Sequence, residues 1–291
     1  MAKEKAQQKP KPKPAARAAG TRPDIATLAG LLLALAGIIG GLILEGGSIK
    51  DITQITAAMI VLGGTIGAVL VSTPLDVTIG AAKRLAAVFL DRTAAPDRLI
   101  EDIIGYATKA RKTGVVSLET EAETIADPFL KKALILAVDG TDLQEIRRMM
   151  ELDIDLAEQR TEAEAKVFES AGGYAPTIGI IGAVLGLIQV MKHLENIEEV
   201  GHGIAVAFVA TVYGVGVANV FFLPAAAKIK ARMALESRRK ELILEGVSGI
   251  VEGLNPKLIR SKLEAFVPPA APRKPKPAAA PKTAAAQTAE A

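Results

Sequence analysis

Cysteine and tryptophan are absent from the sequence, and it contains only two histidines, His193 and His202. The lack of cysteine excludes disulfide bonds, thiolate metal ligands and cysteine nucleophiles. Two histidines are too few for a histidine-based metal cluster. The glycine-rich GGTIGA at 63–68 lies inside an apolar run and is not a nucleotide-binding fingerprint. We therefore expect no catalytic residue, metal site, cofactor or nucleic-acid partner, and the sequence does not indicate an enzyme.

Charged side chains are missing from four long apolar runs. These span residues 25–44, 55–73, 171–191 and 203–223, and none contains Asp, Glu, Lys, Arg or His. Each is close to the ~20 residues that a helix needs to cross the hydrocarbon core of a bilayer. The first run follows a Lys/Pro-rich tail and is too long for the apolar part of a signal peptide. The runs predict an all-α membrane protein with four transmembrane helices.

The distribution of Lys and Arg predicts the orientation of the spans. Seven of these residues precede residue 25, thirteen lie in 74–170 and thirteen follow residue 224. The two short connectors carry one each, Lys50 and Lys192. Cytoplasmic loops are enriched in Lys and Arg. We therefore expect both termini in the cytoplasm, together with a large insertion between the second and third spans.

The predicted organisation has six segments. Residues 1–22 and 267–291 are Pro/Ala/Lys-rich tails with too little apolar content to fold, and we expect them to be disordered. Between them lie spans 1 and 2 (23–73), a helical cytoplasmic insertion (74–170), spans 3 and 4 (171–224) and a cytoplasmic C-terminal helical region (225–266). Within the insertion, Pro96 opens a helix that Gly114 ends, and a shorter helix is expected over 128–138.

Two helices are expected to extend beyond the membrane. Thr141, with Gln144 three residues later, has the capping-box pattern of a helix start. No strong breaker follows before residues 172–173, so this helix is expected to run from the cytoplasm up to the third span. The fourth span is expected to continue past Pro224 in the same way.

Small residues recur one helical turn apart in every span. The pairs are Gly37 and Gly41, Gly63 and Gly67, Gly182 and Gly186, and Gly214 and Ala218. A pair spaced by four lies on one helix face and lets two helix backbones approach closely. Such a face can pack within one bundle or against another subunit, and the spacing does not decide between these alternatives.

The polar residues of the spans suggest dependence on another protein. They include Thr56, Thr65, Thr177, Gln189, Thr211, Tyr213 and Asn219. An intramembrane Thr often bonds to a carbonyl of its own helix. Proton or cation transfer across a bilayer normally uses a charged group at depth, in spite of a cost of about 2.5–3.5 kcal/mol. If the chain conducts ions, a partner must supply the carboxylate.

Two prolines and one charged segment remain as candidate functional features. Pro176 and Pro224 lie near the cytoplasmic ends of the third and fourth spans. A proline there either ends a helix or bends it as a hinge. The segment 109–123 sets Lys109, Arg111 and Lys112 against Glu119, Glu121 and Glu123 across a turn. This pattern is either a solvated surface or a recognition site for a charged partner.

Five stretches resemble the MotA family of bacterial flagellar stator proteins, in the wider MotA/TolQ/ExbB group. They are IATLAGLLLALAGIIGGLILEGG (25–47), IVLGGTIGAVLVSTP (60–74), ARKTGVVSLE (110–119), YAPTIGIIGAVLGLI (174–188) and GIAVAFVATVYGVGVANVFFLP (203–224). The resemblance covers residues 24–255, and the combination of stretches is what makes it specific. Family members commonly begin close to the first span, so the N-terminal tail departs from the pattern.

The resemblance implies a function and its partners. Members of the family form a pentameric ring in the bacterial inner membrane, around two copies of a MotB-type partner. This single-span partner is anchored to peptidoglycan and carries the proton-binding Asp. Ion passage turns the ring, and its cytoplasmic helices push on the rotor protein FliG. The chain is therefore expected to be a stator subunit that helps to convert an ion-motive force into torque.

The resemblance also assigns roles to residues at the cytoplasmic side. Arg111 and Glu119 match the charged pair that engages the rotor. Pro176 and Pro224 match the two functional prolines of the family, which implies that they couple events in the membrane to the cytoplasmic helices.

The ion path is implied by two further positions. Thr211 matches the threonine that faces the path on the fourth span. Sodium-driven relatives carry another threonine on the third span, where this chain has Ala183. One oxygen ligand for Na⁺ is thus missing, and the resemblance predicts H⁺ as the transported ion.

Two other classes of membrane protein fit the sequence less well. An ExbB/TolQ-like energiser passes proton-motive force to an outer-membrane system, and typically has three spans with one before the large loop. The two spans before residue 74, and the segment from Arg111 to Glu119, argue against it. A permease would need a binding site within the spans, for which few polar groups are present.

Overall fold

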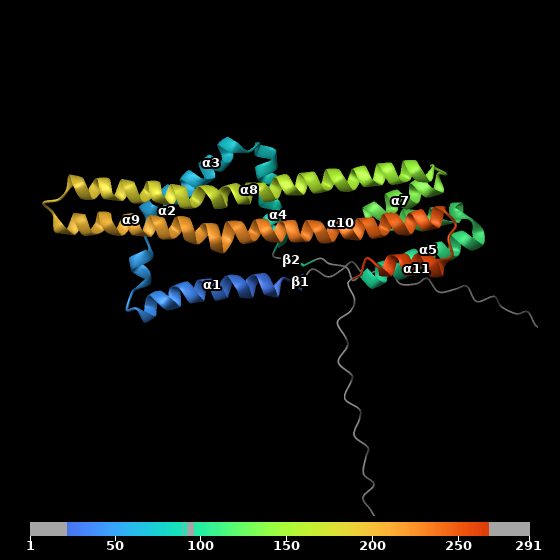
Figure 1. Ribbon diagram of the computed structural model, residues 1–291, viewed down its shortest axis with the longest axis horizontal. Helices are drawn as coiled ribbons and strands as arrows, with labels where there is room; N and C mark the ends of the chain where they lie inside the picture. Colours follow the sequence, from blue (N-terminus) through green and yellow to red (C-terminus); the bar gives the residue numbers. More distant parts are fainter. Residues whose placement is uncertain (1–21, 89, 92–95, 268–291) are drawn as a thin grey trace, which may run out of the picture.

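Two helices much longer than a membrane span run the length of the molecule (Figure 1). The computed structural model describes residues 22–88, 90–91 and 96–267. In it α8 (Leu143–Lys192) has 50 residues. The chain returns through α9 (Ile197–Val217), the π-helical turn η4 (Ala218–Phe222) and α10 (Leu223–Val251), which together form one helical stretch. The expected extension of both spans into long helices is confirmed.

Four helical stretches are long and apolar enough to cross a membrane, which confirms the predicted fold class. They are α1 (Ile25–Leu44), Ile55–Ser72, and one part of each long helix. Ile55–Ser72 consists of α2 (Ile55–Ala58), the π-helical turn η2 (Met59–Gly63) and α3 (Gly64–Ser72). A 3₁₀ turn, η1 (Ile49–Ile52), precedes it. The predicted tails lie, apart from their inner ends, outside the described residues.

The insertion between the second and third spans is helical. It contains α4 (Leu75–Val88), α5 (Pro96–Thr113), the 3₁₀ turn η3 (Val115–Leu118), α6 (Glu119–Thr124) and α7 (Pro128–Val138), followed by the first part of α8. After α10 comes α11 (Pro256–Glu264). Figure 1 shows α5, α7 and α11 gathered around one end of the long helix pair, opposite the connector between α8 and α9. The two-residue strands β1 (Arg22–Pro23) and β2 (Leu90–Asp91) pair antiparallel.

The start of α8 corrects one expectation. Asp142, rather than Thr141, caps the helix, and its carboxylate accepts a hydrogen bond of 2.9 Å from the backbone N–H of Gln144. Thr141 instead belongs to the end of α7. Its N–H donates to Leu136 O at 3.1 Å, after Gly140 has reversed the chain at φ +76°. This is the bond pattern with which helices commonly end at a glycine.

The main hydrophobic core lies at the end of the molecule where α5, α7 and α11 gather. It is built from buried aliphatic side chains of α5, α7, α8, α10 and α11, including Ile103, Leu134, Met150, Ile243 and Leu263. A smaller cluster packs α4 against both long helices. In contrast, α1 has no buried residue. The insertion and the C-terminal region thus form one unit with a core of its own.

Neither proline ends a helix. Pro176 lies inside α8, and Pro224 stands in the first turn of α10, directly after the wide turn η4 of the same helical stretch. The boundary interpretation is therefore wrong for both residues. A π-helical turn next to a proline provides an alternative arrangement for backbone groups that the proline leaves without a partner.

Candidate functional site

Glycines let α8 and α9 touch backbone to backbone. A Cβ atom added at Gly186 would lie 2.8 Å from Ala207 N, and one added at Gly214 would lie 2.5 Å from Ala175 O. Contacts this short do not form, so neither position has room for a side chain. Close approach of this kind is what small residues provide in membrane helix pairs. The pair of helices is therefore held together by its own glycines.

We call the glycine-lined contact between α8 and α9 the glycine seam. Thr211 and Ala183, the two ion-path candidates, lie beside it. Each is the next residue after a contacting pair, since a Cβ on Gly182 would lie 2.7 Å from the Cβ of Ala210. Both are half-buried. The hydroxyl of Thr211 donates to the carbonyl of Ala207 in its own helix at 3.2 Å. Its oxygen can still accept a hydrogen bond, so this level of the helix pair offers one polar group among apolar ones.

Other hydroxyls in the spans also bond to backbone carbonyls. Thr65 is buried and donates to Val61 O at 2.6 Å, which confirms local bonding as the interpretation of this residue. Tyr213 instead fastens the connector between the first and second spans: its hydroxyl donates to Ile52 O at 2.5 Å and accepts from Gln54 N at 3.3 Å. Tyr213 thus ties the fourth span to the start of the second.

The four small-residue pairs divide into two kinds. Gly182, Gly186, Gly214 and Ala218 are buried, which confirms packing within the chain for those pairs. A Cβ at Gly37, Gly41, Gly63 or Gly67 would meet no atom of the described chain within 4 Å. The first and second spans therefore present small-residue faces that this chain does not cover.

Each proline lies beside a close contact with the opposite long helix. Pro176 Cα lies 3.2 Å from the position that a Cβ of Gly214 would take. Leu223, the neighbour of Pro224, fills the space beside Gly172, where an added Cβ would lie 2.6 Å from its Cδ2. A change of backbone conformation at either proline would therefore displace atoms of the opposite helix.

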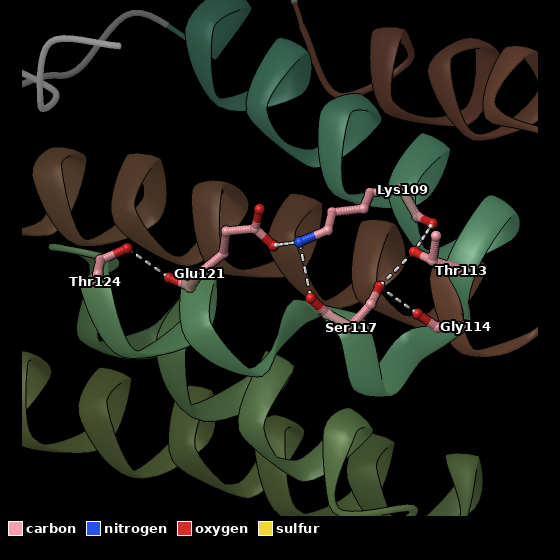
Figure 2. A network of polar contacts seen from close by, with 6 residues as sticks. All are labelled: Lys109, Thr113, Gly114, Ser117, Glu121 and Thr124. Carbon is pink, nitrogen blue, oxygen red and sulfur yellow. Dashed lines mark hydrogen bonds and ion pairs between the residues drawn. The ribbon is translucent and has the colours of Figure 1, made fainter. Parts of the chain in front are cut away.

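Arg111 and Glu119 lie at the other end of the molecule, on the turn from α5 to α6. Both are exposed, and neither forms an ion pair with another residue in the part of the chain that the structure describes. Gly114 (φ +85°) reverses the chain between them. Figure 2 shows that Lys109 crosses this turn, with its Nζ 2.6 Å from Glu121 Oε2 and 2.8 Å from Ser117 O. The cluster 109–123 is thus partly internally paired and partly free.

Two charged groups escaped the sequence analysis. Asp24 caps α1 by accepting from Thr27 N at 3.1 Å, and also binds Lys228 at 2.7 Å and Arg232 at 3.1 Å, which joins the start of α1 to α10. An Asp directly before an apolar run is a recognisable capping signal. Its partners, more than 200 residues away in the sequence, left no local signal.

The second missed group is Glu164, buried on α8 below the third span. Its carboxylate binds Arg84 of α4 and lies 3.6 Å from Arg160 Nε. Gly80 allows this approach, because a Cβ there would lie 2.6 Å from Glu164 Oε1. These residues line a cavity of about 410 Å³ between α4 and the long helices. They fasten α4 to α8.

Ion pairing and burial shift several pKa values outside the spans. Hydrogen bonds from Lys228 and from the Thr27 backbone hold the pKa of Asp24 far below its ordinary value. Arg260, bound to Glu101 at 2.6 and 2.8 Å, lowers the pKa of that carboxyl group. Burial raises the pKa of Tyr106. None of these groups changes charge near neutral pH, so they act as fixed parts of the structure.

Two family descriptions match the chain. Residues 121–266 match the MotA/TolQ/ExbB proton channel family, and residues 28–112 match the motility protein A N-terminal region. Motility protein A of Bacillus subtilis (strain 168) is 35% identical over 246 residues, 84% of this chain and 91% of the relative. Chemotaxis protein PomA of Vibrio alginolyticus is 35% identical over 244 residues, 84% of this chain and 95% of the relative.

Solved structures agree in fold as well as in sequence. The chain aligns with a chain of the C. jejuni MotAB structure at a TM-score of 0.81 and 33% identity, covering 86% of this chain and 98% of the other. For the flagellar MotAB stator complex from Bacillus subtilis, the TM-score is 0.79 and the identity 35%, over 84% and 96% of the two chains.

These likenesses favour the stator interpretation over the ExbB/TolQ-like energiser, because the relatives are motility proteins and the structures are of MotAB. Stator proteins of this kind are ion-channel components rather than enzymes. The chain belongs to the MotA/TolQ/ExbB proton channel family, and within it is a MotA-type stator subunit of the bacterial flagellar motor.

Proposed function

We propose that five copies of this chain form a ring in the bacterial inner membrane around a MotB-type, peptidoglycan-anchored partner. The solved relatives are described as MotAB structures, which supports a MotB-type partner. The uncovered faces of α1 and of α2–α3 support contact with further chains. The number of copies, five, and the attachment of the partner to peptidoglycan are implied by the family resemblance.

Both termini, residues 74–170 and residues 225–266 lie in the cytoplasm in this proposal. The concentration of Lys and Arg in these segments supports that orientation. The connectors 45–54 and 193–202 then face outward, and the proposed domain boundaries follow the ends of the four apolar runs.

One observation carries the proposed mechanism: the four apolar runs contain no Asp, Glu, Lys, Arg or His. The carboxylate that takes up the transported ion must then belong to the partner. The surface of α8 and α9 around Thr211 and Ala183 would be the apolar wall along which that carboxylate moves, with Thr211 as its one polar group. With alanine rather than threonine at 183, the wall suits H⁺ better than Na⁺, because a dehydrated Na⁺ needs several oxygen ligands.

Torque is delivered at the opposite end. Arg111 and Glu119 contact the rotor protein FliG, and their exposure and free charges support this role. Pro176 and Pro224 couple the two ends, because each lies within an unbroken helical stretch and beside a close contact with the opposite helix. Each elementary charge that crosses 100 mV releases roughly 2.3 kcal/mol, so many ions must pass for each turn of the rotor.

The ion is tested by swimming. A stator-deficient strain would express this chain with its candidate MotB-type partner, first without external Na⁺ and then with a protonophore. Swimming that survives Na⁺ removal and stops with the protonophore supports a proton-driven stator. A speed that follows the Na⁺ concentration keeps the stator and overturns the ion. The host must have a compatible rotor, which the matching wild-type stator of that host checks.

Charge reversal tests the rotor contact. Arg111→Glu and Glu119→Lys are expected to abolish most torque while the complex with the partner still forms, since both side chains are exposed. Co-purification with the tagged partner measures assembly, and tethered-cell rotation measures torque. Loss of the complex in either variant would give that residue a structural role instead.

A further inference from the structure

The turn that carries Arg111 and Glu119 contains both unpaired and ion-paired charged residues. Arg111 and Glu119 are exposed and have no ion-pair partner among the residues that the structure describes. Lys109 lies two residues before Arg111, and Glu121 lies two residues after Glu119. These two side chains bind each other at 2.6 Å. In the sequence, the exposed pair Arg111 and Glu119 thus lies between the residues of the ion pair Lys109–Glu121, which Figure 2 shows.

Lys109 joins three successive segments through one atom. Its own backbone lies in α5, its Nζ bonds to the carbonyl of Ser117 in η3 at 2.8 Å, and the same Nζ meets Glu121 in α6. Gly114 lies between these segments in a left-handed conformation that glycine adopts without strain. Left alone, such a reversal would permit several orientations of α6 relative to α5. The side chain of Lys109 selects one of them.

Two hydroxyl groups close the same turn. Thr113 Oγ1 lies 3.0 Å from Lys109 O and 2.7 Å from Ser117 Oγ, which itself lies 2.7 Å from Gly114 O. Two hydroxyl hydrogens cannot serve three contacts at once, because each hydroxyl donates one hydrogen bond. The hydroxyls alone therefore leave the turn with three alternative bond patterns. The ammonium of Lys109, with three donors, can hold its two acceptors in all three patterns.

The ion pair between Lys109 and Glu121 adds little to the free energy of folding. The side chains of Lys109 and Glu121 are 38% and 41% exposed, and exposed ion pairs contribute about 0–1 kcal/mol. The backbone on either side is anchored by apolar burial, since Ala110, Leu118 and Ala122 all belong to the main core. Removing the Lys109 ammonium should therefore loosen the segment from Gly114 to Ser117 and leave the fold intact.

We propose that Lys109 is a positioning residue for the rotor contact: it holds Arg111 and Glu119 at a fixed separation and does not itself touch the rotor. This inference rests on the proposed rotor contact of those two residues. A fixed separation matters because opposite charges recognise a complementary surface only when both can engage it together. A loosened turn would lose torque although both charges remain.

The test compares Lys109→Met with Lys112→Met in the full chain, co-expressed with its MotB-type partner. Both changes remove one positive charge from the same helix end, and Lys112 is exposed with no ion pair in the described part of the chain. Amide hydrogen exchange on the purified complex and tethered-cell torque are measured for each. Lys109→Met is expected to speed exchange of residues 115–118 several-fold and to lower torque several-fold. Lys112→Met should leave the exchange unchanged.

Two more variants sharpen the result. Lys109→Arg keeps a cation with several donors and is expected to restore most of the torque and the slow exchange. Glu121→Gln replaces the charged acceptor with a neutral amide oxygen, and should give a smaller loss than Lys109→Met because the bond to Ser117 O remains. Loss of torque in Lys109→Met with unchanged exchange would mean that Lys109 contacts the rotor directly, which overturns the proposal. Normal torque in Lys109→Met overturns it as well.

Failure of the proposed function has a different signature. If Arg111→Glu turns the rotor normally, the rotor contact is wrong, and the role of Lys109 in it falls too, whatever the exchange shows. If Arg111→Glu stops rotation while Lys109→Met does not, only the positioning role is lost.

Discussion

The two ends of the long helix pair are packed by different means. At one end, α5, α7 and α11 close over α8 and α10 with large aliphatic side chains that are fully buried. At the other, α8 and α9 meet through glycines, and α1 buries none of its side chains. The first end is complete within one chain, whereas the second leaves whole apolar faces for lipid or further chains. Folding and assembly are thus assigned to different parts of the molecule.

The largest effect is expected at the glycine seam. Gly214→Leu would place its Cβ 2.5 Å from Ala175 O, a backbone atom that cannot move aside without separating α8 from α9. We expect no stable complex, as measured by size-exclusion chromatography in detergent. Gly201→Leu is the matched control, because Gly201 lies in the same helix α9 with nothing in the described chain within 4 Å of it, and the complex should survive it. Equal tolerance of both would remove the contrast between the ends.

The aliphatic core should respond next. Leu134 is fully buried in α7, and Leu134→Ala is expected to cost about 2–5 kcal/mol of unfolding free energy. Leu152→Ala serves as the comparison, since Leu152 is 56% exposed on α8, and surface changes usually stay within about 0.5 kcal/mol. Denaturant titration of the complex, followed by pulse proteolysis, measures both. A similar cost for the two would show that Leu152 is covered by another chain.

The smallest effect concerns the tie between α1 and α10. Lys228 lowers the pKa of Asp24 below its ordinary value of 3.8, so the carboxylate stabilises docking of α1 fully above that value. This contribution is lost as the pH falls through the lower folded pKa. At neutral pH, Asp24→Asn should imitate the loss. Disulfide formation between Ala34→Cys and Val220→Cys, which line one cavity of about 330 Å³, reports docking, and it should slow in the Asn variant.

Composition and spacing predicted the architecture because each signal acts locally. The four spans follow from the length of charge-free runs, and Pro96, Gly114 and Pro128 mark real helix ends. Thr141 was assigned to the wrong helix, since the same residue pattern can end one helix or begin the next. Its neighbour Asp142 made the better cap.

The site was predicted less completely, because its parts depend on distant contacts. A glycine spaced by four residues looks the same whether it faces α9 or open space, so the sequence could not separate Gly186 from Gly41. The division of the charged turn into Lys109 with Glu121, and Arg111 with Glu119, depends on where each side chain points. The tie from Asp24 to Lys228 joins the two ends of the sequence, and no local pattern encodes it.

The unbroken course of α8 through Pro176 makes the helix a lever. With a rise of about 1.5 Å per residue, the start of α8 lies roughly 50 Å from that proline. A tilt of about 5° at Pro176 would carry it through about 4 Å, comparable to the size of a side chain. Work is force multiplied by distance, so a long arm turns a small adjustment between packed backbones into a longer stroke with a smaller force.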